Sequence, residues 1–145
     1  MQNKAIDIHH HYVPKQLIEE TRRHGKALGV DIAEDEGSHA LSFAGSKPHR
    51  LQPALMDVER RIEMMNEGQV ALATLEANTN SLGYRLTGEQ GEEWCNLYND
   101  CMHELIKQQP DRFAGMATVP LQDAARAAKV LEHSIIDLNF RGAFI

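Results

Sequence analysis

Short apolar runs that are typical of buried strands alternate along this chain with longer segments of helical periodicity. The strand-like runs lie at 4–9, 70–77, 112–121 and 141–145, and helices are expected over 14–24, after the N-cap candidate Asp57, over 89–108 and after Asp123. Strands that alternate with helices predict an α/β fold with a parallel sheet and right-handed crossovers.

Residues 30–53 interrupt this alternation. The stretch is polar and holds two glycines and two prolines, and only "HALSF" (39–43) alternates as one strand of a small hairpin would. We therefore expect a small insertion or long loop after the first helix, outside the core. Loops of this length in compact domains are usually functional or mobile.

The last residue, Ile145, falls inside the expected fourth strand. Strands usually have about five or six residues, and a barrel of eight strands and eight helices needs about 250 residues, whereas this chain has 145. We expect residues 1–145 to be a partial domain, truncated within that strand. The alternative is a complete, small, open α/β domain with three or four strands.

Composition excludes several classes of function. The formal net charge of −6 argues against a nucleic-acid partner, because phosphate binding needs clustered Lys and Arg. No stretch approaches the ~18 apolar residues of a membrane helix. Cys95 and Cys101 are the only cysteines, which fits a reducing compartment, and we expect a cytoplasmic protein.

Three consecutive histidines, His9, His10 and His11, end the first strand. Side chains alternate along a strand, so Asp7, His9 and His11 are expected on one face and His10 on the other. Two histidines spaced in this way can converge on one cation with metal–nitrogen distances of about 2.1 Å. The alternatives are a polar strand end with satisfied hydrogen bonds, and an unstructured tract that binds metal without chemistry.

Four segments in this order resemble one protein family. "DIHHHYVP" is similar to a D-x-H-x-H opening that is followed by proline, although Pro14 comes one place early, and "QPDRFAGMATVPL" matches P-x-R-F-x-G-x-x-x-x-P. "DVERRIEMM" fits a D-x-x-x-R-I-x-x-M helix, and "AAKVLEHSIIDLNFRGAFI" looks like a helix leading to a fourth strand. Together they resemble the amidohydrolase-related, metal-dependent decarboxylases, the group of aminocarboxymuconate semialdehyde and γ-resorcylate decarboxylases.

The resemblance implies the N-terminal half of a TIM (β/α)8 barrel in which His9 and His11 hold a divalent metal, with zinc the expected ion. It also implies that the remaining ligands and the catalytic acid/base lie beyond Ile145, so the catalytic residues are unknown. The implied reaction is non-oxidative decarboxylation of an aromatic or enoic carboxylic acid, a small-molecule substrate. A metal-dependent amidohydrolase or lactonase, and a non-catalytic truncated half-barrel, remain the alternatives.

Two residues are candidates for substrate binding. Arg50 lies near the position where the family places an arginine for the substrate carboxylate, and a guanidinium suits bidentate carboxylate binding. Asn78 follows the second strand and can line a pocket there, with ordinary turn chemistry as the alternative. Whether the protein forms a homo-oligomer stays open.

Overall fold

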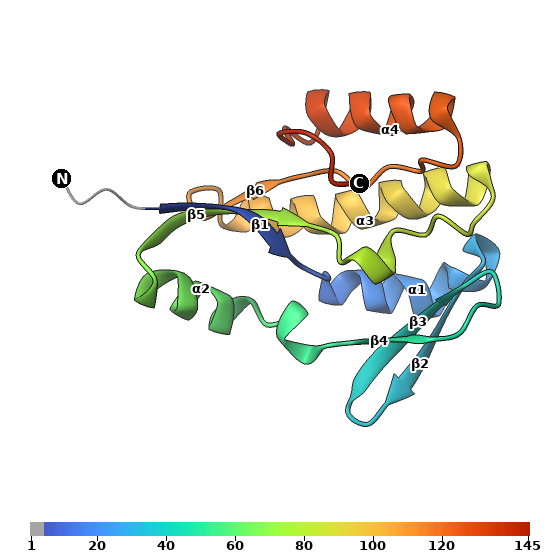
Figure 1. Ribbon diagram of the computed structural model, residues 1–145, viewed down its shortest axis with the longest axis horizontal. Coiled ribbons are helices and arrows are strands. Elements are labelled where there is room, and N and C mark those ends of the chain that lie inside the picture. Colours follow the sequence, from blue (N-terminus) through green and yellow to red (C-terminus); the bar gives the residue numbers. More distant parts are fainter. Residues whose placement is uncertain (1–4) are drawn as a thin grey trace.

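The computed structural model describes residues 5–145, and its main sheet has three parallel strands (Figure 1). The strand order is β1 (Ala5–His11), β5 (Val70–Glu76) and β6 (Phe113–Gly115), so sequential strands of this sheet lie side by side. This order and the helical crossovers are those of the expected half-barrel. The carboxyl ends of β1 and β5 meet at one edge of the sheet, where His11 pairs with Glu76.

Four α-helices connect and cover the strands among the described residues: α1 (Lys15–Leu28), α2 (Val58–Glu67), α3 (Gly88–Gln108) and α4 (Ala124–Ile136). The expected caps are confirmed, because Asp57 accepts from the Arg60 amide at 2.9 Å and Asp123 from the Arg126 amide at 3.2 Å. Short 3-10 turns, η1 (Pro53–Leu55) and η2 (Thr79–Ser81), precede α2 and follow β5. Within residues 5–145, no helix is long and apolar enough to cross a membrane.

The first helix runs to Leu28, further than the expected end at residue 24. Gly25 is buried inside α1, and a Cβ placed there would lie 2.4 Å from the carbonyl oxygen of Val30. Glycine at this position therefore lets the helix approach the next strand instead of ending the helix. The end comes at Gly29, whose φ of 70° is the left-handed conformation that glycine adopts without strain.

The segment 30–53 forms a second sheet, which contains the expected small hairpin and one further strand. Three antiparallel strands, β2 (Val30–Asp35), β3 (Ser38–Phe43) and β4 (His49–Leu51), form it in that order. Leu41, Phe43 and Leu51 are buried in the core cluster, and the Phe43 ring packs against Trp94 with centroids 5.4 Å apart. The expectation that this stretch lies outside the core is wrong, because one face of the sheet covers apolar surface of the barrel segment.

The core is built around α3. Trp94, Tyr98 and Met102 are fully buried on this helix. The Tyr98 hydroxyl donates to the carbonyl oxygen of Tyr12 at 2.7 Å, which ties α3 to the residue after β1. Asn99 joins the chain after β6 to α4, since its amide nitrogen donates to the Thr118 carbonyl and to Ser134 Oγ at 3.0 and 3.2 Å.

An ion-pair cluster also joins α3 to α4. Glu92 accepts from Lys129 at 2.6 Å and also pairs with Arg126. Hydrogen bonds from Lys129 and Arg126 lower the pKa of the Glu92 carboxyl below its usual value. The cluster therefore stabilises the folded chain only while Glu92 is ionised.

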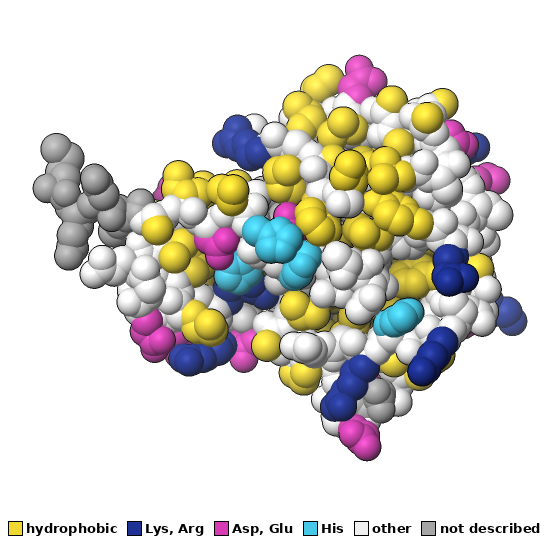
Figure 2. All heavy atoms as spheres, viewed as in Figure 1, with side chains coloured by type: hydrophobic (Ala, Val, Ile, Leu, Met, Phe, Trp, Pro, Cys, Tyr) yellow, Lys and Arg dark blue, Asp and Glu magenta, His cyan; other side chains and the backbone are white. Residues whose placement is uncertain are grey.

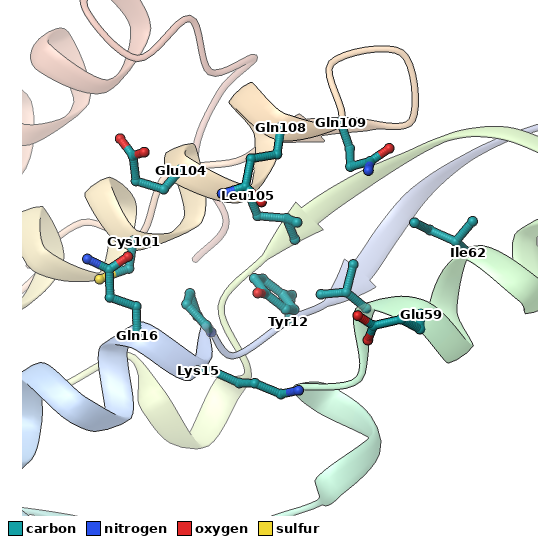
Figure 3. Close-up of a pocket in the computed structure, with 12 residues that line it drawn as sticks. Tyr12, Lys15, Gln16, Glu59, Ile62, Cys101, Glu104, Leu105, Gln108 and Gln109 are labelled. Atoms are coloured by element: carbon teal, nitrogen blue, oxygen red, sulfur yellow. The ribbon is translucent and has the colours of Figure 1, made fainter.

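The helices α1, α2 and α3 meet around Tyr12, where they leave a hollow of about 380 Å³ (Figure 3). Lys15 and Gln16 enter it from α1, and Glu59 and Ile62 from α2. Since Tyr12 follows His11 directly, this hollow lies immediately beyond the histidine run.

The expected fourth strand is present only as one bridge. Ala143 pairs with Ala117 in parallel, supported by hydrogen bonds from Ala117 N to Gly142 O at 2.8 Å and from Phe144 N to Ala117 O at 2.9 Å. The segment thus lies beside the continuation of β6, where the fourth strand of a barrel belongs. Too few of its residues pair for a regular strand to form.

Candidate metal centre

The end of β1 carries an extra residue that changes which side chains meet. Asp7 pairs with Ala73, whereas His10 pairs with Leu75, so three steps along β1 match two along β5. Asp7 Oδ2 lies 2.8 Å from His10 Nδ1, and Asp7 Oδ1 accepts from the His9 amide at 3.1 Å. The expectation that Asp7 lies with His9 and His11 is therefore wrong, because the bulge brings Asp7 to His10.

The expectation that His9 and His11 lie together is confirmed. Their ring centroids are 4.7 Å apart, and the centroid of the Phe144 ring lies 5.7 Å from that of His9 and 5.4 Å from that of His11. Figure 2 shows histidine side chains gathered in the middle of the viewed face, beside hydrophobic side chains. The two imidazoles therefore lie near the surface beside the ring of Phe144, which comes from the C-terminal part of the chain.

The orientation of His11 is fixed by a backbone contact. His11 Nδ1 lies 2.9 Å from the carbonyl oxygen of Ala77, the residue after β5. A carbonyl only accepts, so Nδ1 donates its hydrogen and leaves Nε2 as the nitrogen with a lone pair. Histidines that bind metals commonly have their other ring nitrogen held in this way.

Glu76 is the residue of this site that the sequence analysis missed. It ends β5 and is 2% exposed, with Oε1 at 2.5 Å from His9 Nδ1 and 3.7 Å from His11 Nδ1. Ligand atoms of His9, His11 and Glu76 all lie within 4.8 Å of one another. An acidic residue at the end of the otherwise apolar run "VALATLEA" was the sequence feature that could have revealed it.

Arg61 supports the site from α2. It is 6% exposed, and its Nη2 donates to the carbonyl oxygens of His11, Leu55 and Ala54 at 3.0, 3.3 and 3.5 Å. Its guanidinium also lies 5.5 Å from the ring centroid of Tyr12. Burial lowers the pKa of Arg61 from its usual value. Arg61 therefore anchors the carboxyl end of β1, immediately after the histidines.

The two candidate substrate residues lie in different places. Arg50 is on β4, where its guanidinium lies 3.5 Å from Glu36 Oε2 and donates to the Glu36 carbonyl at 3.4 Å. Asn78 follows Ala77, and its side chain accepts from the Asn80 amide at 3.1 Å, so it caps η2 as turn chemistry predicts. Asn78 is thus next to the backbone that holds His11, while Arg50 reaches toward the tip of the β2–β3 hairpin.

The donor set suits a divalent transition metal. Two imidazoles and a carboxylate are ligands that zinc accepts, and catalytic zinc sites typically have three protein ligands and one open position. The exposed side of His9 leaves room for such an open position, since 63% of its side chain is exposed. The residues present therefore fit a divalent metal with one coordination position left open.

Sequence comparison finds decarboxylases, although no family model matches. The chain is 31% identical over 110 residues to γ-resorcylate decarboxylase of Polaromonas sp. strain JS666, covering 72% of this chain and 34% of that protein. It is 31% identical over 115 residues to the γ-resorcylate decarboxylase of Rhodococcus jostii, covering 79% of this chain and 35% of that protein. The 2-amino-3-carboxymuconate-6-semialdehyde decarboxylase of Dictyostelium discoideum is 22% identical over 138 residues, covering 94% and 38%.

Solved structures share the fold. Dihydroxybenzoic acid decarboxylase of Polaromonas sp. JS666, with bound manganese and 2-nitroresorcinol, superposes with a TM-score of 0.70 at 22% identity, covering 98% of this chain and 38% of that one. The manganese-bound 5-carboxyvanillate decarboxylase of Novosphingobium aromaticivorans superposes with a TM-score of 0.68 at 21% identity, covering 98% of this chain and 41% of that one.

This chain spans about a third of the length of the curated relatives that it matches. The similarity nevertheless extends over most of the chain, and the fold is that of part of an amidohydrolase barrel. The chain is therefore similar, over most of its length, to part of the amidohydrolase-related decarboxylases.

Proposed function

We propose that this chain is the metal-holding part of a non-oxidative decarboxylase that acts on an aromatic or enoic carboxylic acid. The observation that carries the proposal is the His9–His11 pair at the carboxyl end of β1, in a chain whose relatives are decarboxylases. Barrel enzymes place their active sites at this end of their strands. Residues 1–145 would then form one partial barrel domain, with 30–53 as its insertion.

In this proposal His9 and His11 hold a divalent metal. When bound, the metal orients the substrate and stabilises the negative charge that develops as carbon dioxide leaves. Zinc is the ion that we propose, because imidazole and carboxylate donors suit it, whereas the two solved relatives named above carry manganese. His11 is presented to the metal by its contact with Ala77, and the Phe144 ring lies against both imidazoles.

Substrate binding is proposed for two further residues. Asn78 adjoins the backbone that holds His11 and can donate its amide hydrogens to a carboxylate. Arg50 can take this role if its contact with Glu36 is exchanged for the substrate. Both cysteines are unpaired and buried, which supports a reducing compartment and the proposed cytoplasmic location.

The test is release of carbon dioxide. The protein is purified at the length that its own cells produce, established by intact mass, and is loaded with either zinc or manganese. It is then supplied with 2,6-dihydroxybenzoate, the acid whose decarboxylation names one solved relative. We expect metal-dependent carbon dioxide release that is lost in His9→Ala and His11→Ala.

His24→Ala is the matched control. His24 is exposed on α1 and lies 3.6 Å from Glu20, so its loss should leave activity unchanged. Hydrolysis of an amide or lactone without carbon dioxide release would show that the hydrolase alternative is correct. Full activity after removal of either His9 or His11 would refute the metal assignment.

A further inference from the structure

Glu76 is a buried carboxylate with no hydrogen-bond donor for one of its oxygens. The residue is 2% exposed, and Oε1 has no hydrogen-bond partner among the residues that the structure describes. Leaving a buried charge without compensation costs several kcal/mol in general. A cation that approaches from the side of Oε1 would supply the missing partner.

The neighbouring histidines do not satisfy Glu76 by hydrogen bonds. His9 Nδ1 lies 2.5 Å from Oε1, which is an ion pair when the ring is protonated, but the contact does not meet hydrogen-bond geometry, so Oε1 has no hydrogen-bond donor. The Nδ1 hydrogen of His11 is used by the Ala77 carbonyl. No lysine or arginine of residues 5–145 forms an ion pair with Glu76, whereas Glu92, another buried carboxylate, has Lys129 and Arg126.

The three side chains instead surround one small region. Glu76 is the last residue of β5, the middle strand of the parallel sheet, and pairs with His11 of β1. His9 and His11 come from β1, and all three offer ligand atoms within 4.8 Å of one another. Two nitrogens and one carboxylate oxygen are the number and type of protein ligands that catalytic zinc sites use.

We propose that Glu76 is a third protein ligand, within residues 5–145, of a divalent metal that His9 and His11 also bind. The inference adds a ligand to the metal site of the proposed function. It rests on that function only for the role of the metal in decarboxylation. Two ligand atoms of one tetrahedral zinc, with bonds of about 2.1 Å, lie about 3.4 Å apart. Binding therefore requires the exposed His9 ring to move slightly away from Glu76, which its exposure allows.

The experiment titrates the metal-free protein, at the length that its own cells produce, with cobalt(II) and then with zinc, without any substrate. Cobalt reports the number and type of ligands through its visible absorption, and calorimetry gives the zinc affinity. We expect one ion per chain. Glu76→Gln should weaken zinc binding more than 100-fold and shift the cobalt spectrum, because losing a partner that only orients a ligand costs about 10–100-fold.

Glu92→Gln is the matched control, since it neutralises another buried carboxylate at a different place in the fold. It should leave the cobalt spectrum and the zinc affinity unchanged. Thermal unfolding of metal-free Glu76→Gln should occur near the wild-type midpoint, because glutamine keeps the size and shape of glutamate. Weak metal binding in that variant then reflects a lost ligand and not a lost fold.

Two results would overturn the inference: a wild-type chain that binds no cobalt, or a Glu76→Gln variant that keeps the wild-type spectrum and zinc affinity within tenfold. Neither depends on catalysis. A chain that binds metal through Glu76 but belongs to a protein releasing no carbon dioxide would refute the proposed function alone. Carbon dioxide release with unchanged metal binding in Glu76→Gln would refute the ligand alone.

Discussion

Replacing Arg61 by methionine tests whether α2 holds the metal site in place. Methionine keeps much of the length of arginine but cannot donate, so the carbonyl oxygens of His11 and Ala54 lose a buried charged donor. Leu55 O keeps its bond from Val13 N at 3.0 Å and is not left unpaired. The damage should therefore concentrate at the end of β1, next to the proposed ligand His11.

The size of the effect follows from these contacts. A hydrogen bond from a charged donor contributes about 1.5–3 kcal/mol, and only the contact to His11 O, at 3.0 Å, is of good length. The guanidinium above the Tyr12 ring adds about 0.5–2 kcal/mol. Removing the buried cation recovers part of its desolvation cost. We expect the free energy of unfolding to fall by about 2–4 kcal/mol.

Urea unfolding followed by circular dichroism measures the change in stability, and cobalt titration measures the change in metal affinity. Affinity should fall about tenfold or more, because Arg61 orients the backbone of a proposed ligand. Arg60→Met is the control: Arg60 is exposed and pairs with Glu63 at 3.1 Å, and surface ion pairs of this kind contribute little to stability. Equal losses in the two variants would refute an anchoring role for Arg61.

Three further predictions concern the surrounding fold. Wild type should be more stable than Glu92→Gln by a constant amount above the unfolded glutamate pKa of about 4.3, and this difference should shrink as the pH falls through the lowered pKa of Glu92 in the folded chain. Urea unfolding from pH 6 to 3 measures the difference. A difference that does not depend on pH would contradict the prediction. Burial raises the pKa of Cys95 and of Cys101 to about 12. Both thiols should therefore react with a disulfide reagent at pH 8 only after denaturant is added. Rapid labelling of the native chain would count against their burial. Gly25→Ala should lower the free energy of unfolding by about 1–3 kcal/mol despite the better helix propensity of alanine, because the added Cβ meets the carbonyl oxygen of Val30. An unchanged urea midpoint would show that α1 and β2 can move apart without cost.

The order of strands and helices was predictable because it depends on local periodicity. The caps at Asp57 and Asp123 and the buried strand at 70–77 were identified in this way, and each forms near its expected place. The segment 30–53 was not, because its strands are short and their polar faces hide the apolar residues that reach the core. Burial of Phe43 and Leu51 depends on contact with distant elements, which periodicity does not report.

The histidine pair was likewise predictable from spacing, but its surroundings were not. Strand alternation places His9 and His11 together, whereas the bulge that separates Asp7 from them is visible only in the register of β1 against β5. Glu76 lies far from the histidines in sequence and reaches them because parallel strands end at the same edge. Pairing between distant strands thus decides which carboxylate joins the site.

The two sides of the site are held with unequal firmness. Glu76 ends the central strand, is nearly inaccessible to solvent, and directly follows Leu75, where β5 pairs with both β1 and β6. His9 lies within the bulge of β1, which has one strand neighbour among the described residues, and most of its side chain is exposed. A metal would therefore meet a fixed carboxylate and a movable imidazole. The energetic cost of organising the site then falls mainly on β1, which is the strand that Arg61 and Tyr98 anchor at its carboxyl end.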